Sequence, residues 1–280
     1  MKRVLTIQDI SCIGKCSLTV ALPILSALGL ETAIVPTAVL STHTQFPHPT
    51  FRDLTEDLPP IREHWQELKF KFSAIYTGYL GSARQVDLVL DYFKAFKENG
   101  TALIVDPAMA DGGKLYAGFD PSFPSDMKRL CAGAEIILPN LSEAALLLDE
   151  PYPGEEADPD TVRHLLKGLS EIGARYSIIT GVTHADGTFG FSGYDREDDR
   201  FFSFGTPKVP MKSHGTGDIF ASAFTGLYVR GFSIEEALKA ASVYTAGCIR
   251  NSSEDPEHVD YAVNFEAELP NLLRLAGIIA

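Results

Sequence analysis

The feature that most constrains the fold of this 280-residue chain is a regular alternation of short β-branched runs with longer helical stretches. Strands are expected at residues 4–8, 32–37, 72–77, 102–106, 135–138 and 176–180, and helices at 17–28, 83–99, 142–148 and 159–172. Parallel strands need crossover connections, so repeated strand–helix units predict a parallel sheet with helices on both faces. Ligands of such sheets bind at the carboxyl ends of the strands.

The last third of the chain departs from this alternation. Residues 188–193 and 200–204 alternate apolar and polar side chains around an acidic turn, which predicts an antiparallel hairpin added to the sheet. Helices are then expected at 218–230, 233–249 and about 265–275. Pro59-Pro60 and residues 151–160 are interpreted as loop-rich joints, but neither resembles a domain linker. We therefore expect one α/β domain over residues 1–280.

Composition excludes several classes of function. The net charge of −13 opposes binding to nucleic acid or to an anionic membrane, and no basic patch offsets it. No apolar window approaches the length of a bilayer span, and the first residues are interpreted as a strand rather than a signal peptide. The four cysteines, Cys12, Cys16, Cys131 and Cys248, lack zinc-finger spacing. We expect reduced thiols and a cytoplasmic protein.

The residues Ser213-His214-Gly215-Thr216-Gly217-Asp218, followed by an apolar helix, form the most informative motif. Gly215 and Gly217 leave room for backbone N–H groups to turn inward, and the helix start adds further N–H donors. This pattern predicts an anion pocket suited to a phosphate group. Asp218 at its edge is predicted to deprotonate a substrate hydroxyl, and the helix N-terminus favours its ionised, weakly basic form. The alternative is a Gly-rich turn with a capping Asp.

Other polar residues fall at the expected carboxyl ends of the strands. They are Asp9, Thr44, Tyr79, Asp106, Asn140 and Thr180. Asn140 and Glu143 have the spacing of an N-terminal helix cap, so on sequence alone a capping role is favoured. Asp111 precedes two glycines and has an alternative role as a turn residue, and Thr180-Gly181 has one as a strand-end turn.

The G-T-G-D motif resembles the catalytic signature of the ribokinase-like superfamily of small-molecule kinases. Three further segments resemble the pyridoxal (vitamin B6) kinases within it: AVLSTHTQF at 38–46, TGYLGS at 77–82 and VDPAMAD at 105–111. The resemblance implies a ribokinase-like three-layer αβα sandwich with a mostly parallel sheet and an antiparallel hairpin. It also implies ATP as phosphoryl donor, Mg²⁺, a monovalent cation as a further cofactor, and a homodimer.

On the donor side the resemblance assigns catalysis to Asp218 together with Gly215, Thr216 and Gly217. ATP is expected to contact Gly215, Gly217, Asp106, Asp111, Asn140 and Thr180. Glu143 and Asp106 are the expected Mg²⁺ residues, a role that does not exclude the helix cap. Ala108 and Ala110 stand where the family has valine and glycine beside Met109.

On the acceptor side the resemblance assigns the ring pocket to Asp9, Cys16, His43, Thr44 and Tyr79. A tyrosine and a threonine at strand ends suit a flat heteroaromatic ring. Asp9 replaces a family serine that contacts the pyridine ring, Cys16 falls on another ring-lining position, and Leu40 replaces a common phenylalanine. These departures concern the substrate more than the reaction.

The function expected from these residues is ATP-dependent phosphorylation of the 5′-hydroxymethyl group of pyridoxal, pyridoxine or pyridoxamine. One alternative is a hydroxymethylpyrimidine kinase of thiamine synthesis, whose acceptor is also a heteroaromatic hydroxymethyl group. A sugar kinase is a further alternative, which residues 41–44 and 78–82 disfavour. A non-catalytic B6-binding protein is disfavoured by the complete phosphate apparatus.

Overall fold

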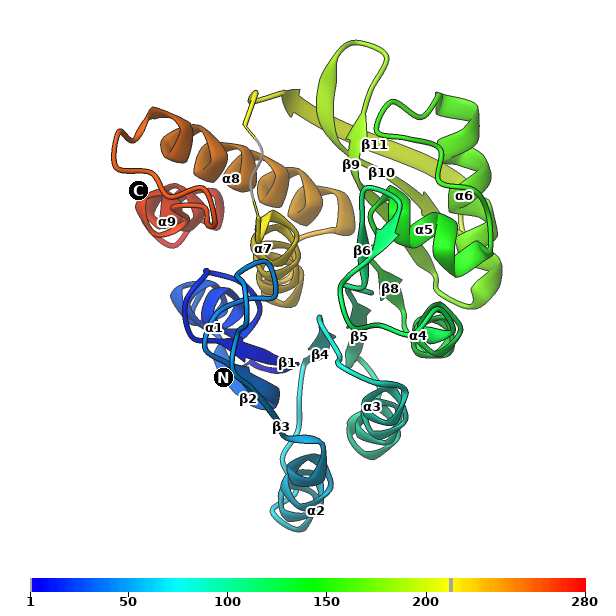
Figure 1. Cartoon of the computed structure of the whole chain (residues 1–280), viewed down its shortest axis with the longest axis vertical. Helices are drawn as coiled ribbons and strands as arrows, with labels where there is room; N and C mark the ends of the chain where they lie inside the picture. The colour runs from blue at the N-terminus through cyan, green and yellow to red at the C-terminus, as the bar shows by residue number, and fades with distance from the viewer. Residues whose placement is uncertain (1, 212–213) are drawn as a thin grey trace.

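The computed structural model describes residues 2–211 and 214–280, so Ser213 of the glycine-rich motif lies outside the described residues (Figure 1). A nine-stranded sheet has the order β11-β10-β9-β8-β5-β4-β1-β2-β3. Its strands are β1 (Arg3–Ser11), β2 (Glu31–Leu40), β3 (Phe51–Asp53), β4 (Ala74–Thr77), β5 (Ala102–Val105), β8 (Ile136–Ile137), β9 (Tyr176–Thr183), β10 (Thr188–Asp195) and β11 (Arg200–Pro207). The pairs β2–β3, β9–β10 and β10–β11 are antiparallel and the others parallel.

Helices cover both faces of this sheet (Figure 1). One face packs against α1 (Leu18–Ala27), α7 (Thr216–Arg230), α8 (Ile234–Glu254) and α9 (Leu269–Leu275). The other packs against α2 (Leu58–Glu67), α3 (Ala83–Phe96), α4 (Phe123–Ala132), α5 (Leu141–Leu148) and α6 (Pro159–Ile172). Successive strand residues alternate between the two cores, as Val4 and Leu5 do. The three-layer αβα sandwich, mostly parallel with an antiparallel hairpin, is confirmed.

Two helices were not predicted, and proline explains both omissions. Pro59 and Pro60 occupy the first turn of α2, and Pro124 that of α4, where a residue without an N–H loses no helical hydrogen bond. The interpretation of residues 59–60 as a loop-rich joint is therefore wrong. Among the described residues no helix combines the length and apolarity needed to cross a membrane.

Two strands continue beyond the ends expected for them, through irregular positions. β1 runs on to Ser11, and its register with β2 shifts between Gln8 and Ile10, on either side of Asp9. β9 runs on to Thr183 and bulges at Gly181, whose φ is +71°. Bulges re-aim neighbouring side chains and are common beside active sites. Asp9 and Thr180 therefore lie at strand irregularities rather than at strand ends.

Candidate active site

The glycine-rich motif forms an open helix N-terminus at α7. Gly215 caps the helix with φ +76°, and a Cβ atom on it would lie 2.4 Å from the Lys15 carbonyl oxygen, so only glycine fits. Thr216 begins the helix and Gly217 is exposed in its first turn, where a Cβ would approach only the Asp106 carboxylate, at 4.0 Å. The first N–H groups of α7 therefore face an accessible space suited to an anion.

Asp218 lies in the first turn of α7 and is half-buried. Burial raises its pKa to about 6, and the nearby Asp9 charge adds to this, whereas the nearby Ser17 backbone N–H lowers it. The carboxylate is still mostly ionised at pH 7, as expected. The expectation of low basicity is wrong because desolvation outweighs the helix N-terminus. A carboxylate with this pKa is well matched to general-base work near neutral pH.

Two of the predicted acceptor residues, Asp9 and Cys16, lie near Asp218, and a third, Tyr79, lies near Asp9. The Asp9 carboxylate is buried and accepts a hydrogen bond from the Ser11 hydroxyl at 2.9 Å. Burial raises the pKa of the Cys16 thiol, and the charges of Asp218 and Asp9 raise it further, so this side chain lies near both carboxylates. Burial and then Asp9 raise the pKa of Tyr79 to about 12. Cys16 and Tyr79 therefore both lie near the Asp9 carboxylate.

The loop after β2 contacts Gly14 and the glycine-rich motif. His43 packs against Gly14, where a Cβ would lie 2.1 Å from the imidazole Cδ2, and its Nε2 lies 3.1 Å from the Tyr261 carbonyl oxygen. Gln45 donates a 2.7 Å hydrogen bond through Nε2 to Nδ1 of His214, which links this loop to the glycine-rich motif. Thr44 is exposed on the same loop, outside the buried group.

Asp106 and Glu143 form a buried acidic pair. Asp106 follows β5, and burial, then Glu143, then Asp218 raise its pKa well above the usual range. Glu143 is buried, and burial raises its pKa as well, against hydrogen bonds from backbone N–H groups. Its carboxylate accepts from Asn140 at 2.9 Å, Met109 at 3.0 Å and Ala110 at 3.4 Å. The capping box between Asn140 and Glu143 is therefore present.

The remaining predicted residues flank this acidic group. Asp111 is exposed and accepts a 2.8 Å hydrogen bond from the Gly112 N–H, in the turn between β6 (Ala110–Asp111) and β7 (Lys114–Leu115). Thr180 donates its N–H to the Pro139 carbonyl oxygen at 2.9 Å and pairs with Asn140 in an isolated bridge. Sequence analysis missed Tyr116, which follows β7. Burial raises its pKa, as do the charges of Glu143, Asp106, Asp111 and Asp218.

The acidic side chains fit a divalent cation. Asp106 and Glu143 are buried carboxylates that raise each other's cost of ionisation, which a bound cation would relieve. Within residues 2–211 and 214–280, no three or more His, Cys, Asp or Glu side chains stand ready to hold a metal ion together.

We predict that Asp106→Asn stabilises the ligand-free protein while impairing activity. The pKa of Asp106 is higher in the folded protein than in the unfolded chain. The folded protein therefore loses stability as the pH rises from the unfolded-state pKa toward the folded-state pKa. The amide removes that cost, and we expect a gain in Tm of about 2 °C or more at pH 7.5. Thermal unfolding and kcat are measured on the same preparations. A lower Tm together with unchanged kcat would contradict this account of Asp106.

Comparison with known proteins agrees with this fold. The family model described as phosphomethylpyrimidine kinase matches residues 25–264. A Bacteroides thetaiotaomicron structure assigned as a phosphomethylpyrimidine kinase, in a crystal form with pyridoxal, is 38% identical, covers 97% of this chain and 95% of that chain, and has a TM-score of 0.91. Pyridoxal kinase from Lactobacillus plantarum is 31% identical, with 98% of each chain covered and a TM-score of 0.89.

A further relative is the thiamine biosynthetic bifunctional enzyme of Arabidopsis thaliana, which is 28% identical over 90% of this chain. This chain spans 47% of the length of that enzyme. The matched family model covers most of the chain, and the solved structures share its fold almost from end to end. The chain therefore belongs to the phosphomethylpyrimidine kinase family, within the ribokinase-like superfamily, and is a kinase.

Proposed function

We propose that this kinase transfers the γ-phosphoryl group of ATP to the 5′-hydroxymethyl group of pyridoxal and the related B6 vitamers. The observation that carries the proposal is the buried Asp9 carboxylate, which lies beside Tyr79 and close to Asp218. ATP-dependent conversion of pyridoxal to its 5′-phosphate, followed by mass spectrometry, tests it directly. No phosphorylated vitamer at saturating ATP would refute it.

The charge of the pocket supports a basic ring as acceptor. A buried carboxylate is costly unless a positive group pairs with it. Within the described residues, the charge that lowers the pKa of Asp9 is that of His43. The pyridine nitrogen of a B6 vitamer is basic enough to supply that positive charge. The ring of hydroxymethylpyrimidine is a weaker base and supplies it less readily. Asp9 therefore favours the vitamer.

Transfer would depend on the orientation of the acceptor hydroxyl between two groups of α7. Asp218 accepts the hydroxyl proton as the oxygen bonds to phosphorus, and the N–H groups of the first turn stabilise the charge on the phosphoryl oxygens. Asp106 and Glu143 are the residues proposed to hold Mg²⁺, directly or through water. When bound, the metal neutralises charge on the phosphates.

The phosphoryl donor, the cations, the oligomeric state and the location of the protein are also proposals. Mg²⁺-ATP as donor, a monovalent cation, a homodimer and a cytoplasmic location are all implied by the family resemblance. Light scattering after size exclusion tests the homodimer, and activity after chelation and metal replacement tests the cations.

A hydroxymethylpyrimidine kinase is the second candidate. The matched family model and the similarity to a thiamine biosynthetic enzyme favour it. The two candidates share the donor site and the base, and they differ in the ring that Asp9 must accommodate.

We predict that Asp9→Asn discriminates between these acceptors. The amide keeps the size and part of the hydrogen bonding but removes the charge, so kcat/KM for pyridoxamine and pyridoxine should fall about 5- to 30-fold, the effect of about 1–2 kcal/mol. Any activity on hydroxymethylpyrimidine should change less than threefold. Asp91→Asn, which alters an exposed carboxylate on α3, is the control. Equal losses on every acceptor would mean that Asp9 only supports the fold.

A further inference from the structure

The segment between β1 and α1 has an unusual backbone. Gly14 has φ +131°, and two residues that are not glycine, Lys15 and Ser17, have φ values of +50° and +51°. Residues with side chains adopt this region only where surrounding contacts hold them there. The contacts of residues 12–17, here called the β1–α1 loop, therefore identify what keeps it in place.

The backbone of the β1–α1 loop touches the catalytic end of α7 at two points. The Lys15 carbonyl oxygen lies directly against Gly215, in the space that a Cβ would take. The backbone N–H of Ser17 lies near the Asp218 carboxylate and lowers its pKa. The strained loop therefore contacts both the cap of the anion-binding helix and the proposed base.

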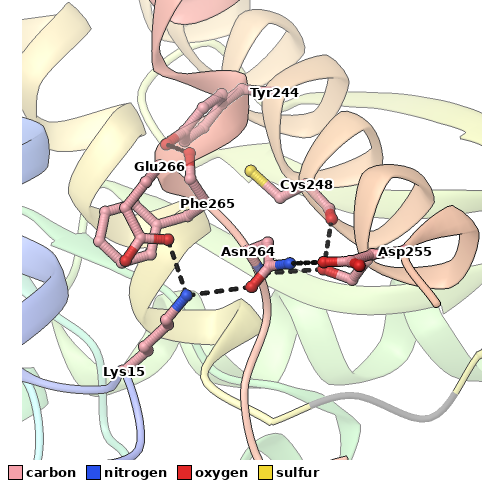
Figure 2. A network of polar contacts seen from close by, with 8 residues as sticks. Lys15, Tyr244, Cys248, Asp255, Asn264, Phe265 and Glu266 are labelled. Carbon is pink, nitrogen blue, oxygen red and sulfur yellow. Dashed lines mark hydrogen bonds and ion pairs between the residues drawn. The ribbon is translucent and has the colours of Figure 1, made fainter. Parts of the chain in front are cut away.

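The side chain of Lys15 ties this loop to the C-terminal part of the chain (Figure 2). Its Nζ lies 2.8 Å from Oε2 of Glu266 and 3.1 Å from Oδ1 of Asn264. The ammonium also lies 5.9 Å from the centre of the Phe265 ring. The Lys15 ammonium therefore contacts three consecutive residues that lie about 250 positions later in the chain.

The segment that receives Lys15 is itself fixed to α8. The Asn264 N–H donates to the Ser252 hydroxyl at 2.8 Å, and its Nδ2 donates to Asp255 Oδ2 at 2.8 Å. The Tyr244 hydroxyl donates to the Phe265 carbonyl oxygen at 3.1 Å (Figure 2). Because α8 packs along α7, these contacts close a ring from Lys15 through α8 and α7 back to the β1–α1 loop.

We propose that Lys15 is a positioning residue, which holds the β1–α1 loop against α7 and thereby sets the orientation of the Asp218 carboxylate. The inference rests on the proposed role of Asp218 as base. The Lys15 and Glu266 side chains are 31% and 52% exposed, so the pair adds little to global stability. Its effect is expected in catalysis, where a small displacement of a reacting group lowers the rate strongly.

A double-mutant cycle tests this inference. The turnover of pyridoxal is measured with radiolabelled ATP for the wild type, Lys15→Met, Asp218→Asn and the double variant. We expect Lys15→Met to lower kcat about 10-fold in the wild-type background and less than about 2-fold in the Asp218→Asn background. Lys15→Arg, which keeps the ion pair, should restore at least about half of kcat. Glu266→Gln removes the other partner of the ion pair and should also lower kcat. It takes the place of Lys15→Met in the cycle if Lys15→Met does not fold.

A matched control is Lys71→Met, which breaks a 2.9 Å ion pair with Glu98 that is also exposed. It should leave kcat unchanged. An undiminished kcat in Lys15→Met, or equal losses in both backgrounds, would overturn the positioning role. Wild-type turnover in Asp218→Asn alone would instead refute the proposed base.

Discussion

Asp218→Asn is expected to lower kcat by about 10²–10⁴ while the protein still folds and binds nucleotide. The substitution keeps the shape of a side chain in the first turn of α7 and removes its negative charge and its ability to accept a proton. The change is measured as phosphorylated vitamer formed per enzyme, with nucleotide affinity and Tm recorded beside it. A variant that keeps near wild-type turnover would reduce Asp218 to a helix cap.

The pH dependence of kcat/KM is a second test of Asp218 as the base. With a pKa of about 6, Asp218 loses its capacity to accept a proton as the pH falls through that value. The wild-type kcat/KM should therefore decline on the acidic side near pH 6, because only the ionised carboxylate acts as a base. The residual activity of Asp218→Asn should lack this decline. The same acidic limb in both proteins would assign the titration to another group.

The second large effect is expected from Gly217→Ala. This glycine lies in the first turn of α7 with open space around its Cβ position, so alanine should fold normally and gain slightly in helix propensity. Its methyl group would occupy the side from which a phosphate approaches the N–H groups. We expect kcat/KM for ATP to fall about 10²-fold with Tm unchanged or raised. Full activity in Gly217→Ala would place the phosphate elsewhere.

Gly215→Ala is the matched comparison in the same motif. Here φ is +76° and the new Cβ would lie 2.4 Å from the Lys15 carbonyl oxygen. The substitution should therefore lower the stability of the folded protein. A cost of about 2–3 kcal/mol would lower Tm by roughly 5–10 °C. Gly231→Ala, with φ +112° and no atom within 4 Å, isolates the cost of the backbone conformation alone. Equal Tm values for Gly215→Ala and Gly231→Ala would mean that the contact with Lys15 is soft.

The alternation of strands and helices predicted the architecture because it reflects which faces are buried. Val4 and Leu5 enter opposite cores, so neighbouring residues in one strand already require a layer on each side. The two missed helices show where this reasoning fails. Proline usually indicates that a helix is interrupted, so the sequence around the prolines of α2 and α4 did not predict a helix. The first turn of a helix nevertheless tolerates proline.

The proximity of the candidate residues was predictable in part from the topology of the sheet. Asp9 and Cys16 lie near Asp218, and Tyr79 lies near Asp9, because the segments at the carboxyl edge of a parallel sheet lie close together. The pKa of Asp218 was not predictable, since desolvation depends on the loops that cover it.

Two other features depend on contacts between distant parts of the chain. Gln45 and His214 are joined by one hydrogen bond across 169 positions of sequence. Lys15 reaches Glu266 in the same way. The local sequence does not predict such contacts, because each of these residues taken alone is typical of a polar residue on the surface.

Internal competition between the two candidate acceptors distinguishes the two proposed substrates in a single reaction. The enzyme is given limiting Mg²⁺-ATP and an equimolar mixture of pyridoxal and hydroxymethylpyrimidine, and both phosphorylated products are quantified by mass spectrometry at low conversion. The product ratio equals the ratio of the two kcat/KM values. We expect an excess of pyridoxal 5′-phosphate of about 10-fold or more, since the Asp9 carboxylate favours the more basic ring. An excess of hydroxymethylpyrimidine phosphate would contradict it.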